Sequence, residues 1–151
     1  FNAINWAWRD AAGRAFFEDA KRFIRIRRIY PEIFEHFPPT HRDANIAKVA
    51  SRIEGAANPL QAYGRFAGGR AVLVVPNPTT GTATVEVAPD YGALGVDRQI
   101  LHNVKDLMNG TFLIEKKSLP ERFSVTLAPE YLGVYLVEPV AASSVGQGIW
   151  E

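Results

Sequence analysis

Residues 60–87 read LQAYGRFAGGRAVLVVPNPTTGTATVEV, and this stretch decides the fold class. Its two ends, residues 60–66 and 82–87, show the two-residue alternation typical of strands with one buried face. Between them, residues 70–75 are apolar after Arg70 and predict a strand buried on both faces. Gly68-Gly69 and the cluster from Asn77 to Gly81 supply the turns that join these strands.

The same pattern continues to the end of the chain, with further strands expected at residues 99–104, 111–114, 123–127 and 131–137. Turn signals separate these segments about every ten residues, which is the spacing of an all-β domain. Asn109-Gly110-Thr111 matches a glycosylation acceptor, but Asn-Gly is a stronger signal for a hairpin turn. We therefore predict a mainly β fold, an antiparallel Greek-key-type sandwich of about seven or eight strands with an N-terminal α-helix.

The N-terminal helix is predicted over residues 14–30, and Pro31 ends it. Its apolar residues follow helical spacing and need another surface to cover them: Phe16, Phe17, Ala20, Phe23, Ile24 and Ile26. Residues 32–57 form a connector that fits a short helix or an irregular strand equally well. The expected organisation is helix and connector at 1–57, sandwich at 58–139 and a flexible tail at 140–151, with the chain being a fragment of a longer protein.

Composition narrows the partners of this 151-residue chain, which has no cysteine and a formal net charge of +1. A nearly neutral protein has no overall field that attracts nucleic acid, so such a role would need a local patch. The densest basic cluster suits the solvent face of an ordinary amphipathic helix: Lys21, Arg22, Arg25, Arg27 and Arg28. No apolar run reaches the length of a membrane-spanning helix. We expect neither a nucleic acid nor a membrane as partner.

No pattern of catalytic or metal-binding residues stands out. His36, His41 and Asp43 lack the spacing of a metal site, and no serine lies in a nucleophile-elbow motif. The loop carboxylates are of the kind that forms turns: Asp90, Asp97, Asp106 and Glu115. The sequence therefore predicts no catalytic residue, no metal and no cofactor.

Flat aromatic rings can stack on the apolar faces of sugars. Tyr91, in a glycine-rich loop, and Trp150, in the tail, are the candidate carbohydrate-binding residues. The remaining aromatic residues of this kind are expected mostly in the core: Trp6, Trp8, Tyr63, Phe66 and Tyr131.

Five segments, in this order, resemble the end of α-amylase-superfamily and related barrel-plus-sandwich glycoside hydrolases. The helix end FIRIRRIYP (23–31) is similar to the last helix of their catalytic barrel. AYGR (62–65), AVLVVPNP (71–78), VKDLMNG (104–110) and FSVTLAP (123–129) resemble segments of their C-terminal sandwich. The resemblance covers about residues 14–31 and 60–138.

The resemblance implies that the catalytic residues belong to a barrel outside this chain. The chain would then be a non-catalytic C-terminal accessory domain that supports the barrel and contacts polysaccharide. The alternative is a free-standing carbohydrate-binding module. A parent enzyme that acts on polysaccharides would suggest a secreted or periplasmic location, which no residue of this chain indicates. An exposed apolar patch around Phe16, Phe17 and Phe23 would favour the accessory domain, and a row of aromatics on one sheet face would favour the module.

Overall fold

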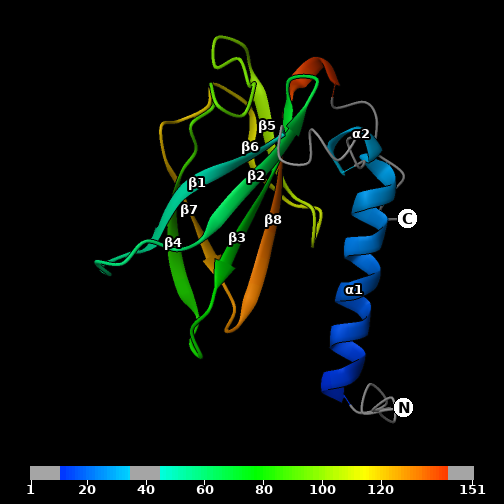
Figure 1. The fold of residues 1–151 in the computed structure, drawn as a ribbon, viewed down its shortest axis with the longest axis vertical. Helices are drawn as coiled ribbons and strands as arrows, with labels where there is room; N and C mark the ends of the chain where they lie inside the picture. Colours follow the sequence, from blue (N-terminus) through cyan, green and yellow to red (C-terminus); the bar gives the residue numbers. More distant parts are fainter. Residues whose placement is uncertain (1–10, 35–44, 143–151) are drawn as a thin grey trace.

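The computed structural model describes residues 11–34 and 45–142 of the chain (Figure 1). It contains the helices α1 (Ala11–Ile29) and α2 (Pro31–Phe34), a short 3-10 helix η3 (Val140–Ala142) and eight strands. The strands are β1 (Ile46–Ile53), β2 (Ala62–Ala67), β3 (Arg70–Asn77), β4 (Ala83–Ala88), β5 (His102–Asp106), β6 (Phe112–Lys117), β7 (Phe123–Leu127) and β8 (Tyr131–Pro139). The predicted mainly β class with an N-terminal helix is confirmed.

All eight strands join one antiparallel sheet in the order β6-β5-β8-β3-β2-β1-β4-β7. The sheet curls into a half-barrel because β1 changes partners along its length. Residues 46–49 of β1 pair with β2, and residues 50–53 pair with β4. This shared strand holds the two halves in one hydrogen-bonded sheet, so the predicted sandwich is not confirmed.

β1 also corrects the predicted boundary between residues 57 and 58. Residues 46–53, placed in the connector, form a strand in the middle of the sheet. The strand alternates, with Val49 and Ser51 buried and Lys48, Ala50 and Arg52 exposed. The sheet therefore begins at Ile46 and not at Asn58.

The hairpin of β2 and β3 forms as the sequence predicts. Ala67 pairs with Arg70, and Gly68 and Gly69 between them have φ of 57° and 76°. Positive φ at both central residues is the geometry whose twist matches that of the two strands, and glycine adopts it without strain.

β3 is buried on both faces, as its apolar run predicts. On the inner face, Leu73 and Val75 belong to the core that the curled sheet encloses. On the outer face, Val72 packs with Val134 and Leu136 of β8 beneath the two helices. The helix residues of this outer cluster include Ile26, Tyr30 and Ile33, all buried.

Polar contacts fasten the helices to the sheet beside this outer cluster. Arg70 of β3 forms an ion pair with Glu32 of α2, and its guanidinium lies 5.7 Å from the centre of the Tyr30 ring. The Asn45 side chain donates a hydrogen bond to the Ile33 carbonyl at 2.8 Å. Burial raises the pKa of Tyr30 to about 12. The C-terminal end of α1 is thus fixed by apolar packing and by directed bonds.

Asn77, the last residue of β3, forms hydrogen bonds to the turn that follows it and to the end of β7. Its buried side-chain nitrogen donates to the carbonyls of Gly81, Leu127 and Ala128 at 2.9, 3.1 and 2.8 Å. Its oxygen accepts hydrogen bonds from the Thr79 nitrogen and hydroxyl. One side chain therefore ties the turn after β3 to the end of β7 and satisfies backbone groups there.

Gly133 of β8 provides a test of the close packing around the buried ring of Tyr135. A Cβ built at Gly133 would lie 2.5–2.8 Å from the Tyr135 ring and hydroxyl, and that ring is fully buried. We expect Gly133→Ala to lower the free energy of unfolding by about 1–3 kcal/mol, because a buried ring has little room to shift. Urea denaturation measures this. Gly81→Ala is the control, since nothing lies within 4 Å of its Cβ; an equal loss in both variants would contradict the close approach.

Candidate functional site

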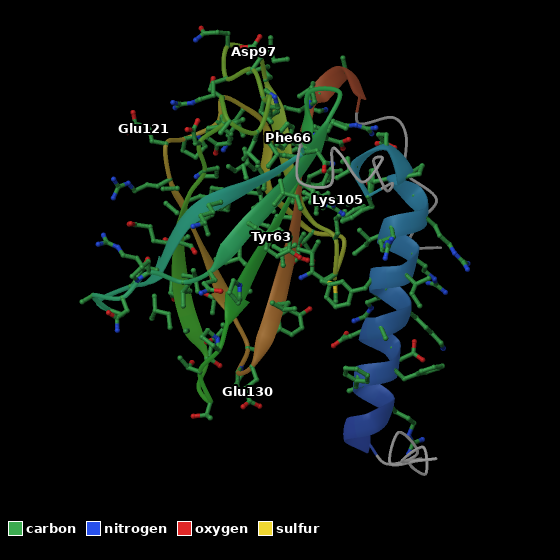
Figure 2. The ribbon with its side chains drawn as sticks, viewed as in Figure 1. Tyr63, Phe66, Asp97, Lys105, Glu121 and Glu130 are labelled. Atoms are coloured by element: carbon green, nitrogen blue, oxygen red, sulfur yellow. The ribbon has the colours of Figure 1, made fainter. Side chains whose placement is uncertain are left out.

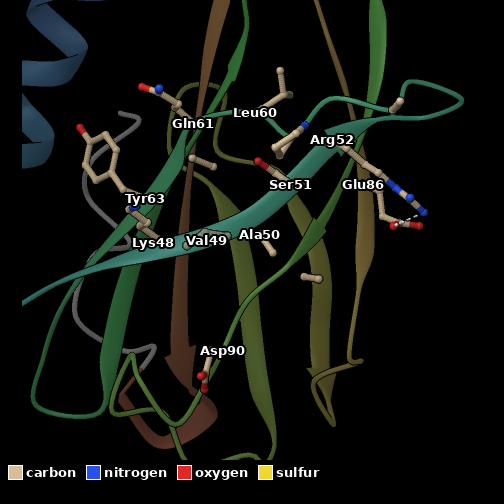
Figure 3. Close-up of a pocket in the computed structure, with 14 residues that line it drawn as sticks. Lys48, Val49, Ala50, Ser51, Arg52, Leu60, Gln61, Tyr63, Glu86 and Asp90 are labelled. Carbon is tan, nitrogen blue, oxygen red and sulfur yellow. Dashed lines mark ion pairs between the residues drawn. The ribbon is translucent and has the colours of Figure 1, made fainter.

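A groove of about 1050 Å³ lies on the outer surface where β1 passes from β2 to β4 (Figure 3). Ala50 of β1 and Ala88 of β4 are cross-strand partners and both line the groove. Two methyl side chains facing each other leave space that longer side chains would fill. The hollow is thus a direct result of small residues in register at the point where the sheet curls.

Polar side chains and one aromatic ring border the hollow. Lys48, Arg52 and Gln61 line it, with the carboxylates of Glu86 and Asp90. Tyr63 of β2 also lines the groove and is 43% exposed (Figure 2). The combination of an accessible ring with donors and acceptors suits a polyhydroxylated ligand, whose hydroxyls both donate and accept hydrogen bonds.

The two carboxylates of the groove are both engaged by neighbouring groups. Glu86 lies in β4, where Arg52 and Arg122 approach its carboxylate at 3.2 and 3.4 Å. Asp90 follows the end of β4, and its Oδ1 accepts a hydrogen bond from the Ala93 nitrogen at 3.0 Å. Figure 3 shows the two side chains on separate parts of the groove lining.

Tyr91 is a core residue and not the exposed ring that its glycine-rich loop predicts. It is 3% exposed, and its hydroxyl donates to the Pro120 carbonyl at 3.1 Å. The Arg98 guanidinium lies 5.5 Å from the ring centre. Burial raises the pKa of Tyr91 to about 12, with Arg98 acting in the opposite direction. Its ring has no free face for a sugar.

The other residues singled out by sequence fall in three groups. Trp150, His36, His41 and Asp43 lie outside the described residues. Turn roles are confirmed for Asp90, Asp97 and Asp106, whose Oδ1 atoms accept backbone hydrogen bonds, whereas Glu115 lies in β6. The turn role of Asn109 is confirmed as well, since its side-chain oxygen accepts from the Thr111 nitrogen and hydroxyl.

Residues 11–34 and 45–142 contain no cluster of three potential metal ligands. His102 is fully buried, and its Nδ1 lies 2.9 Å from the Ile100 carbonyl oxygen. Over the same part of the chain, no helix is both long and apolar enough to cross a membrane.

Comparison of the sequence with known protein families and with curated proteins finds no match.

Tyr63 shows the opposite error to Tyr91. The sequence analysis expects Tyr63 in the core, and the structure places it on the surface. The sequence did contain a signal for the exposure of Tyr63. Tyr63 alternates with the small residues Ala62 and Gly64, and small residues on the inner face of a strand suggest that its other face is exposed to solvent. The neighbouring turn of Gly68-Gly69 fixes the register but does not indicate which face is covered.

The core role of Tyr91 is testable. Tyr91→Phe removes the hydrogen bond to Pro120 but keeps the ring, so we expect a loss of about 0.5–1.5 kcal/mol in the free energy of unfolding. Thermal and urea denaturation measure it. Binding to glycans should be unchanged by this variant, and a loss of binding without a loss of stability would make Tyr91 a ligand contact.

Proposed function

We propose that this chain is a non-catalytic C-terminal accessory domain of a glycoside hydrolase, which supports a catalytic barrel and contacts carbohydrate. The observation that carries the proposal is the apolar surface of α1. Phe16 is 75% exposed, Phe17 45% and Ile24 52%. Phe23, by contrast, is half-buried against the outer cluster. Large exposed apolar side chains on a helix whose C-terminal half packs on the sheet support a surface that another protein covers.

The groove supports the secondary role in carbohydrate contact. It brings Tyr63 together with Gln61, Lys48 and Asp90 on one open surface. Stacking on a tyrosine ring and hydrogen bonds to flanking polar groups are the interactions that a sugar offers.

The alternative is a free-standing carbohydrate-binding module. The exposed ring of Tyr63 favours it, because such a module needs accessible aromatics on one face. Among the residues lining the groove, Tyr63 is the single aromatic, whereas a module of this kind would present a row. The accessory domain therefore accounts for more of the exposed surface than the module does.

The coding sequence upstream of Phe1 tests the proposal most directly. We expect it to encode a barrel whose final helix is α1, with catalytic carboxylates in the barrel. The chain by itself should then release no product from chromogenic glucosides, galactosides or starch. Hydrolysis by the purified chain, abolished by substitution of its own carboxylates, would contradict the non-catalytic role. An upstream sequence without a barrel would favour the module.

Binding through the groove is tested by Tyr63→Ala. We expect about tenfold weaker binding to the polysaccharide that a glycan array identifies, because an exposed anchor ring of this kind contributes 1 kcal/mol or more. Isothermal titration calorimetry measures the change. Phe112→Ala is the matched control, since Phe112 is a similarly exposed aromatic on β6, outside the groove. Equal loss in both variants, or in neither, would remove Tyr63 as the contact.

A further inference from the structure

The curled sheet has two open edges, one formed by β6 and the other by β7. Within residues 11–34 and 45–142, no further strand pairs with the outer side of either edge. Figure 1 shows β7 beside β4, on the side of the sheet away from α1 and α2. An unpaired edge presents a row of backbone N–H and C=O groups with which another strand can pair. The two edges differ in how well they are protected against such pairing.

β6 has features that prevent edge-to-edge pairing, and β7 does not. Lys116 and Lys117 of β6 are exposed and charged, and Lys116 has a φ of 50°. The pairing of β6 with β5 is also interrupted by register shifts. Charged side chains and bulges make an edge a poor template for another strand. β7 has the uncharged sequence FSVTL and pairs with β4 in an unbroken register, so β7 is the edge that a further strand can extend.

The hydrogen bonding of β4 shows which backbone groups of β7 face the open edge. The Glu54 nitrogen donates to the Thr84 carbonyl at 2.9 Å, so the backbone groups of Thr84 face β1. Because successive residues face opposite sides, those of Val85 face β7. Val85 bonds to its pairing partner there, and the residues on either side of that partner, Ser124 and Thr126, direct their N–H and C=O groups to the open edge. In the described part of the chain, no backbone bond occupies these four groups.

We propose that β7 pairs with β7 of a second copy of this chain, antiparallel and about a two-fold axis at Val125. In this register Ser124 lies opposite Thr126 of the second copy, so the open groups of both strands satisfy one another in four backbone hydrogen bonds. The half-buried Phe123 lies opposite the buried Leu127 of the second copy, so apolar side chains meet on the inner face. The two curled sheets then form one continuous sheet.

The residues that flank β7 favour a second copy as the occupant. Arg122, the charged residue next to β7, lies opposite the uncharged Ala128 of the second copy, so no like charges meet. Pro120 and Pro129, which have no N–H to donate, fall outside the paired residues 122–128. The formal net charge of +1 gives little repulsion between two copies. Because one short strand from each copy makes a small interface, we expect a weak dimer that forms with rising concentration.

Two matched double variants test this pairing. Ser124→Lys with Thr126→Lys places like charges opposite each other, whereas Ser124→Lys with Thr126→Glu places opposite charges there. Both variants lose the hydrogen bond from Ser124 to Glu54, so that loss cancels between them. Sedimentation equilibrium of the intact chain, from about 10 µM to about 1 mM, measures the dimer dissociation constant. We expect the first variant to raise this constant at least about tenfold, and the second to keep it within about threefold of the unsubstituted chain. Circular dichroism confirms that both are folded.

Hydrogen exchange gives a second readout. The amides of Ser124 and Thr126 should exchange more slowly as the chain concentration rises, because dimerisation buries them in hydrogen bonds. A chain that stays monomeric up to about 1 mM overturns the inference. Equal weakening of the dimer by the two double variants overturns it as well. Loss of the dimer in Phe112→Ser or Phe16→Ser, both exposed aromatics away from β7, assigns the contact to β6 or α1 instead. The upstream coding sequence decides the proposed function independently of these results.

Discussion

The two-sided burial of β3 is the constraint on which the rest of the structure depends. Its inner side chains fill the core of the curled sheet, while Val72 and the neighbouring Leu136 of β8 make the outer face equally apolar. Burial stabilises by about 25 cal/mol per Å² of apolar surface, so this outer face requires a cover. The C-terminal half of α1, with α2, provides it. The Arg70–Glu32 ion pair then fixes the helices over the strands that need them.

The strands predicted from sequence were those whose periodicity is local. Residues 70–75 and 82–87 carry their burial pattern in their own side chains, and both form strands. For β1 the sequence left a short helix and an irregular strand open, because its inner face includes Ala47 and Ser51, which give a weak apolar signal. Its change of partner at Ala50 is also a non-local event that no window of sequence records. Because β1 pairs with both β2 and β4, the strands form one curled sheet and not the two separate sheets of a sandwich.

The candidate site was harder to predict than the fold, because the exposure of a side chain depends on segments that are distant from it in the sequence. Tyr91 is buried in the inner core, and it also contacts the Pro120 carbonyl and the Arg98 guanidinium; its glycine-rich surroundings indicate none of this. Tyr63 is exposed because the helices cover the other end of the outer face and because Ala50 and Ala88 leave a hollow beside it. The sequence shows which residues are aromatic, but which of their rings is accessible depends on how the strands assemble into the sheet.

The packing of α1 in the outer cluster is concentrated in one half of the helix. The α1 residues of that cluster, Phe23, Ile26 and Ile29, all lie beyond Arg22. Helices in water depend on such packing more than on intrinsic propensity, and Gly13 lowers that propensity further. Phe16, seven residues before Phe23, keeps 75% of its surface exposed. A protein that covered Phe16 and Ile24 would therefore add apolar burial to α1, as α1 and α2 themselves add it to the outer face of β3.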